Sequence, residues 1–157
     1  MQKKSLDLLK KRLFELDFRQ DWIQEFIRYI EHSIKKGAVL VLLFGSRAKK
    51  DFLRDSDIDI LIVSRELPDD VRERALDFFS DSLPVQPFVM RPDELEERIE
   101  KLDFLIFDAF EDGVVLYSDM DMERVNDLLR KSKEHFSLKR VKHGWRFDAA
   151  AARAAGI

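Results

Sequence analysis

Two short motifs separated by ten residues carry the chemistry of this chain. Gly45-Ser46 follows the apolar run 38–44, and Asp57-Ile58-Asp59 leads into the apolar run 60–63. Both runs are short and rich in Val, Leu and Ile, which predicts buried strands. A Gly-Ser turn at a strand end can offer backbone N–H groups to a phosphate, and aspartates at alternate positions of a strand point to one face. Because Mg²⁺ prefers carboxylate and phosphate oxygens, the motifs predict metal-assisted nucleotidyl transfer.

Each motif alone also fits a simpler structure. Gly45-Ser46 is typical of a plain strand-to-helix turn, with glycine at the bend and serine as the N-cap. The acids can form a solvated turn, and those at the spacing of a calcium-binding EF-hand loop are Asp55, Asp57, Asp59 and Glu66. Ile60 stands where that loop requires glycine, which excludes it. The presence of both motifs at neighbouring strand ends favours a nucleotide and metal site. A bound cation would supply the positive charge needed to compensate a buried Asp59 carboxylate.

The composition limits the class of protein. The 157 residues suit one domain over 1–157, and 45% hydrophobic with 38% charged residues is neither a disordered nor a membrane composition. The net charge of −3 argues against a general nucleic-acid-binding surface. The absence of cysteine excludes disulfides and thiolate metal sites. The charged segment 1–12 does not resemble a signal peptide and no apolar run has membrane-spanning length, so we expect a cytoplasmic protein with no membrane partner.

The sequence around the motifs predicts the elements that must position them. Apolar residues at helical spacing predict helices over 6–16 and 22–36, the second ending before Gly37. Strands are expected over 38–44, 57–64, 85–90 and 114–117. Pro87 indicates that the third of these strands lies at a sheet edge or contains a bulge. Further helices are expected over 68–83, 92–110 and 122–136.

The C-terminal part is basic. Residues 137–145 are expected to be irregular and are followed by a weakly held, alanine-rich end. Cationic side chains around Trp145 fit either RNA binding or a solvated tail with the indole folded back on the core. The predicted fold class is α/β (α+β), a small mixed sheet packed by helices, with its core at about 20–118 and a C-terminal helix and basic tail over 121–157.

The two motifs together resemble those of a known superfamily. The runs Leu43-Phe44-Gly45-Ser46-Arg47-Ala48 and Ser56-Asp57-Ile58-Asp59-Ile60-Leu61 resemble the polymerase-β-like nucleotidyltransferases, and more closely the minimal nucleotidyltransferases (MNT proteins). The resemblance runs from the helix before Ala38 to about Tyr117 and implies the nucleotidyltransferase palm with extra helices at both ends. It implies that Gly45 and Ser46 hold the nucleotide phosphates, and that Asp57 and Asp59 are catalytic and bind Mg²⁺. Arg47 is expected to neutralise charge on the phosphates, which suits a guanidinium.

One position departs from the family pattern. The family has a third carboxylate on the strand after the intervening helix, and Gln86 stands at the matching position in 85–90. That acid completes the metal clamp and helps to activate the attacking hydroxyl. An amide oxygen can ligate a metal weakly but cannot act as a base. The departure implies weakened activity, a one-metal site, or retention of binding alone.

The resemblance also implies a biological role. It implies a Mg²⁺-dependent transfer of a nucleoside monophosphate, AMP from the nucleoside triphosphate ATP, to a hydroxyl acceptor. Minimal members are similar to antitoxins that silence HEPN-domain toxins by adenylylating a toxin tyrosine, so we expect a HEPN-type toxin as partner. The alternative is a nucleotidyltransferase-fold binding module that neutralises its partner by complex formation. A homo-oligomer is left open, and nucleic acid is not expected as a partner.

Overall fold

The computed structural model describes residues 1–50 and 56–157. Its elements fall into two compact units, which we describe separately. The sheet unit comprises residues 1–92 and 108–120, and the helical unit comprises residues 93–107 and 121–157. The single domain expected over 1–157 stays a prediction, and the polar segment 51–55 between the two motifs lies outside the described residues.

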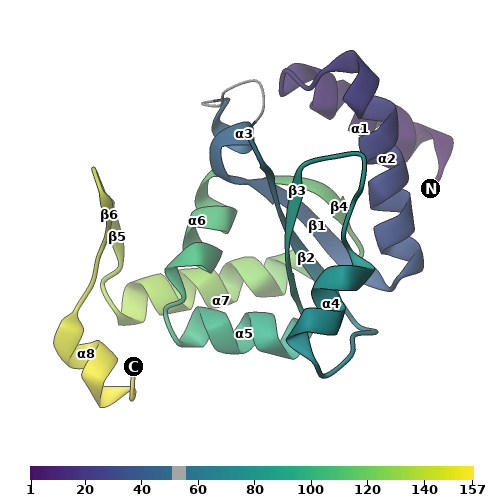
Figure 1. Cartoon of the computed structure of the whole chain (residues 1–157). Helices are drawn as coiled ribbons and strands as arrows, with labels where there is room; N and C mark the ends of the chain where they lie inside the picture. The colour runs from purple at the N-terminus through teal and green to yellow at the C-terminus, as the bar shows by residue number, and fades with distance from the viewer. Residues whose placement is uncertain (51–55) are drawn as a thin grey trace. The chain divides into compact units, whose positions relative to one another are not determined.

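A four-stranded mixed sheet, counted over the described residues, forms the centre of the sheet unit (Figure 1). Its order is β3-β2-β1-β4, with strands β1 (Ala38–Phe44), β2 (Ile58–Ser64), β3 (Val85–Met90) and β4 (Val114–Ser118). β1 is antiparallel to β2 and β4, whereas β2 and β3 are parallel. Strands β1 and β2, which are rich in Val, Leu and Ile, lie at the centre, and Pro87 lies on an edge strand, where a missing N–H is tolerated. The predicted α/β class and mixed sheet are confirmed.

Two helices pack against one face of this sheet. α1 (Lys3–Glu15) and α2 (Gln20–Lys35) share a buried cluster with alternate residues of the central strands. Members of this cluster include Leu13, Phe26, Ile30, Val41, Leu43, Ile58, Ile60 and Ile62. α2 ends as predicted, because Gly37 adopts a φ of +88° and donates its N–H to the Ile34 carbonyl at 3.0 Å.

The helix predicted over 68–83 is shorter than expected. α4 (Val71–Asp77) ends where the Phe78 carbonyl accepts a hydrogen bond from the Tyr29 hydroxyl at 2.8 Å. Beyond it, the Ser80 hydroxyl oxygen accepts the Leu83 N–H at 3.1 Å. Serine thus offers the backbone a local alternative to the helical hydrogen bonds, which the apolar spacing could not reveal.

The helical unit contains a break that the sequence analysis did not predict. The stretch expected as one helix over 92–110 forms α5 (Pro92–Glu100) and α6 (Phe104–Asp112), and each of these helices has residues in both units. Leu102 adopts a φ of +56°, and the Asp103 carboxylate accepts the Leu105 N–H at 3.1 Å. A left-handed residue followed by an aspartate cap ends one helix and begins the next.

The basic C-terminal segment is also more regular than expected. After α7 (Met122–His135), strands β5 (Lys139–Val141) and β6 (Gly144–Arg146) form a two-stranded hairpin, followed by α8 (Ala149–Ala154) (Figure 1). The Trp145 ring lies edge-on to Phe107 at 6.0 Å, and the charged groups of Lys133 and Arg140 lie 5.5 and 5.1 Å from its centroid. Packing of Trp145 on its own unit thus orders a segment that composition alone presents as a tail.

Over the ranges that the structure describes, no helix is both long and apolar enough to cross a membrane.

Candidate active site

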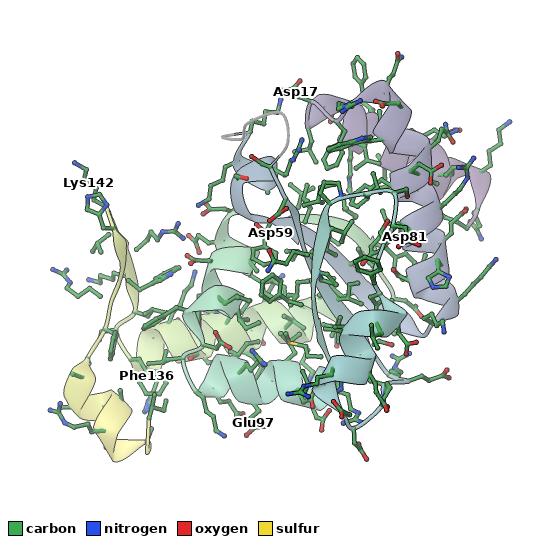
Figure 2. The ribbon with its side chains drawn as sticks, viewed as in Figure 1. Asp17, Asp59, Asp81, Glu97, Phe136 and Lys142 are labelled. Atoms are coloured by element: carbon green, nitrogen blue, oxygen red, sulfur yellow. The ribbon has the colours of Figure 1, made fainter. Side chains whose placement is uncertain are left out.

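Asp59 lies where three strands come together at one end of the sheet (Figure 2). It pairs with Phe44, the last residue of β1, in the antiparallel ladder, and with Gln86 of β3 in the parallel ladder. Because Gly45 follows Phe44 directly, the turn into α3 (Gly45–Lys49) is next to the Asp59 side chain. The two sequence motifs, separated by ten residues, are therefore adjacent in space.

Gly45 is the point of closest approach between these motifs. A Cβ atom placed on Gly45 would lie 3.2 Å from Asp59 Cγ and would overlap its Oδ2 atom. Gly45 also adopts a φ of +70°, a backbone conformation that side chains disfavour. Glycine is thus required here twice, for the bend of the chain and for the space that the carboxylate occupies. Ser46, the next residue, is half-buried in α3.

Asp57 lies directly before β2, and Asp59 is the second residue of that strand. Ile58 between them is completely buried, whereas Asp57 is exposed and Asp59 is half-buried, which is the alternation of a β-strand. Burial raises the pKa of the Asp59 carboxyl above its ordinary value, and the neighbouring charge of Asp57 raises it further. Burial penalises the charge of Asp59 itself, and Asp57 adds the repulsion of a like charge, so a bound cation would relieve both effects.

The oxygen donors at this position fit a hard divalent cation. Two carboxylates and the amide oxygen of Gln86, which is exposed on the strand beside Asp59, are ligand types that Mg²⁺ takes together with phosphate oxygens. Across the described part of the chain, no group of three or more Asp, Glu, His or Cys side chains gathers as a metal site. The pair of aspartates thus suits a cation that is completed by a ligand's own oxygens.

The side chain of Arg47 is buried. Its side chain is 1% exposed, and its Nη2 and Nε atoms donate to the Ser56 carbonyl oxygen at 2.8 and 3.3 Å. Its guanidinium carbon lies 5.7 Å from the Phe18 ring centroid and 5.1 Å from that of Trp22. The structure thus places Arg47 between the aromatic side chains of the α1–α2 region and the backbone that enters β2.

Sequence reasoning missed the parts of this arrangement that come from distant segments. Phe18 and Trp22 are spaced like core residues of an amphipathic helix, so their contact with Arg47 leaves no distinct signal. The Ser56 carbonyl is a backbone group and is invisible in a sequence of side chains. The edge-on contact between the rings of Phe44 and Phe88, whose centroids lie 5.4 Å apart, depends on strand register.

Known proteins that are similar to this chain include two solved structures and the members of one family. A candidate nucleotidyltransferase from Sulfolobus solfataricus is a similar solved structure, at 23% identity, with a TM-score of 0.44 and coverage of 75% of this chain and 91% of that one. A second, described as a toxin-antitoxin with AMP-PNP, has 19% identity, a TM-score of 0.42 and coverage of 71% and 83%. No curated protein matches the chain. Residues 23–131, more than half of the sequence, match the family model described as the nucleotidyltransferase domain, and this chain belongs to that family.

Proposed function

We propose that the chain is a Mg²⁺-dependent nucleotidyltransferase that transfers AMP from ATP to a hydroxyl acceptor. The observation that carries the proposal is the adjacency of Gly45 and the Asp57/Asp59 pair, within a chain of the nucleotidyltransferase domain family. The acceptor we propose is a tyrosine of a HEPN-type toxin, so that the chain acts as a cytoplasmic antitoxin. That acceptor rests on the resemblance of the two motifs to minimal nucleotidyltransferases.

The reaction requires little covalent chemistry from the protein. The acceptor oxygen attacks the α-phosphorus of ATP, the bond to the β-phosphate oxygen breaks, pyrophosphate leaves, and the hydroxyl proton is lost to solvent or a base. Gly45 and Ser46 would bind the phosphates through backbone N–H groups and the serine hydroxyl. Asp57 and Asp59 would hold Mg²⁺, which when bound neutralises phosphate charge and favours the ionised acceptor. The role of the chain is therefore positioning and electrostatic stabilisation.

Gln86 determines how effective such an enzyme can be. It lies in register with Asp59, so it can give an amide oxygen to the same site, but it cannot accept a proton at neutral pH. We therefore expect slower turnover than with a carboxylate at this position. This residue also favours the second candidate function, a binding module that neutralises its partner by forming a complex.

Transfer of label from ATP separates the two functions. The protein, Mg²⁺ and ATP labelled at the α-phosphate are incubated with a purified HEPN protein from the neighbouring reading frame, and the label on that protein is measured. We expect label with the native chain and none with the Asp57→Asn/Asp59→Asn variant. Asp81→Asn, an exposed aspartate on the turn between α4 and β3, is the matched control and should transfer normally. A tight complex with no label in any variant would establish the binding module instead.

A further inference from the structure

We infer that Arg47 is a positioning residue that fixes the backbone at Asp57, and that the N-terminal helices α1 and α2 take part in the metal site through it. The inference rests on the proposed function, because it assigns Asp57 to a cation. It gives Arg47 a task other than direct contact with phosphate, the role expected from the sequence.

Two hydrogen bonds of Arg47 end on the peptide group that leads into Asp57. Nη2 and Nε both donate to the Ser56 carbonyl oxygen, at 2.8 and 3.3 Å. That oxygen belongs to the same planar unit as the Asp57 nitrogen, so holding it restricts the backbone rotation that aims the Asp57 carboxylate. Arg47 itself lies two residues after Gly45, in α3. One side chain therefore links the turn after β1 to the start of β2.

The guanidinium suits this link better than any other side chain. It is always charged, and its rigid fork directs two N–H groups to one acceptor, which a lysine ammonium on a flexible stem does not reproduce. At 1% exposure, its charge is enclosed by protein and its position is set by packing. A residue whose donors are directed at a backbone carbonyl in this way is suited to hold a loop in place.

The connection between α1 and α2 encloses the guanidinium. The rings of Phe18 and Trp22 lie 5.7 and 5.1 Å from its central carbon, within the range of a cation–π contact. A second contact joins the same regions, because the Lys50 ammonium, directly after α3, lies 3.6 Å from the carboxylate of Asp17. Asp17 adopts a φ of +58°, which turns the chain sharply between the two helices. The helical hairpin and α3 are thus held together at two points.

A matched control exists within the same unit. Arg74 is 5% exposed and its Nε donates to the Pro68 carbonyl at 2.6 Å, so it is also a buried arginine that holds a backbone carbonyl. Pro68 follows the far end of β2, a strand of seven residues, roughly 20 Å from Asp57 at about 3.3 Å per residue. Arg47→Lys and Arg74→Lys make the same chemical change at opposite ends of one strand.

The test measures metal binding and backbone protection in the two variants. Mn²⁺ affinity of the nucleotide-free protein is measured by titration, and ATP affinity is measured in the presence of a chelator. Arg47→Lys is expected to weaken Mn²⁺ binding by about 10- to 100-fold, as removal of groups that orient metal ligands does, with metal-free ATP affinity unchanged. Arg74→Lys should match the native protein in both. If Arg47→Lys keeps its Mn²⁺ affinity, the positioning role is overturned. If it also loses metal-free ATP affinity, a phosphate contact is supported instead.

Hydrogen exchange separates failure of this inference from failure of the proposed function. Without metal or nucleotide, Arg47→Lys should accelerate exchange about fivefold at residues 56–58, and Arg74→Lys should do so only near Pro68. Unchanged exchange at 56–58 overturns the positioning role. If the native protein binds no Mn²⁺ while this exchange result is obtained, Arg47 still positions Asp57 and the proposed metal-dependent function is what fails. Should Arg47→Lys not fold, Trp22→Leu removes one enclosing ring, and its exchange at 56–58 decides in the same direction.

Discussion

Asp59 and Gln86 are direct neighbours in the parallel ladder between β2 and β3. Under the proposed function, the amide stands in the place expected for a third carboxylate beside the aspartate pair. Its chemistry differs from that of a carboxylate in two respects, since it carries no charge and cannot accept a proton. Both differences can be reversed by one substitution.

Gln86→Asp is therefore expected to increase adenylyl transfer by up to about 100-fold, the lower end of the range for an added acid–base group. The new charge beside Asp59 should also lower the melting temperature in chelator and allow Mg²⁺ to restore it. The turnover number and the melting temperature with and without Mg²⁺ are the measurements. Gln24→Asp, on the exposed side of α2, is the control and should change neither. Unaltered turnover in Gln86→Asp would indicate that catalysis is not limited at this position.

Gly45→Ala should abolish transfer and reduce stability. The new methyl group would displace the Asp59 carboxylate, and the φ of +70° adds a strain of about 1–2 kcal/mol. Gly144→Ala distinguishes the two effects, because Gly144 has a φ of +110° and open space around its Cβ position. That variant should carry the strain alone and transfer AMP normally. Label transfer and urea denaturation of both variants provide the comparison.

Gly113→Ala is expected to destabilise the sheet unit without a direct effect on the site. A Cβ there would lie 2.6 Å from a Leu42 methyl group and 3.0 Å from the Leu43 carbonyl oxygen, and it would overlap the Ala109 carbonyl. Backbone atoms cannot give way as side chains do, so we expect a loss of about 1–3 kcal/mol in the free energy of unfolding. Urea denaturation measures it. Gly156→Ala has open space around its Cβ position but a φ of +78°, so it should lose only the conformational strain of about 1–2 kcal/mol. A loss in Gly156→Ala equal to or larger than that in Gly113→Ala would contradict the crowding argument.

Tyr29 should make the protein less stable at alkaline pH. Its hydroxyl is buried and donates to the Phe78 carbonyl at 2.8 Å, and burial raises its pKa above the ordinary value of about 10. The folded protein therefore keeps this proton at a pH where the unfolded chain has lost it. Its contribution to stability is constant below pH ~10 and falls above that, by at most about 1.4 kcal/mol per pH unit.

Tyr29→Phe tests this pH dependence. The variant should lose about 1 kcal/mol at neutral pH, because the Phe78 carbonyl loses its donor, yet its stability should decline less steeply above pH ~10. Denaturant midpoints measured between pH 8 and 11.5 give the two slopes. Tyr117→Phe is the comparison, since Tyr117 is the second tyrosine of the chain and its pKa is also raised by burial. Parallel pH profiles for native and Tyr29→Phe proteins would rule out the assignment to Tyr29.

The sequence was most informative where apolar runs are continuous and bounded by strong signals. β1 begins after Gly37 and ends before Gly45, and β3 lies between Pro84 and Pro92, so the predicted limits of both strands match the structure. The adjacency of Gly45 and Asp59 follows from pairing of the two apolar strands. Local signals such as glycine and proline thus define the ends of the strands, and with them the positions of Gly45 and Asp59 in the candidate site.

Long-range packing accounts for what could not be predicted. Leu102 adopts a left-handed backbone conformation, which a leucine in the sequence does not indicate. This residue divides one predicted helix into two. The order in the 139–146 hairpin depends on Trp145 finding Phe107, a partner distant in the chain. Arg47 bonds to a backbone carbonyl and lies beside rings from another helix pair, so no local pattern reports its environment.

The cation–π contacts give the molecule two separate optical reporters. The chain has two tryptophans, Trp22 beside Arg47 in the sheet unit and Trp145 beside Lys133 and Arg140 in the helical unit. If either tryptophan is replaced by phenylalanine, the fluorescence of the remaining indole reports only on the unit that contains it. The loss of structure in each half can then be observed separately, and coincident or separated transitions would show whether the two units unfold as one.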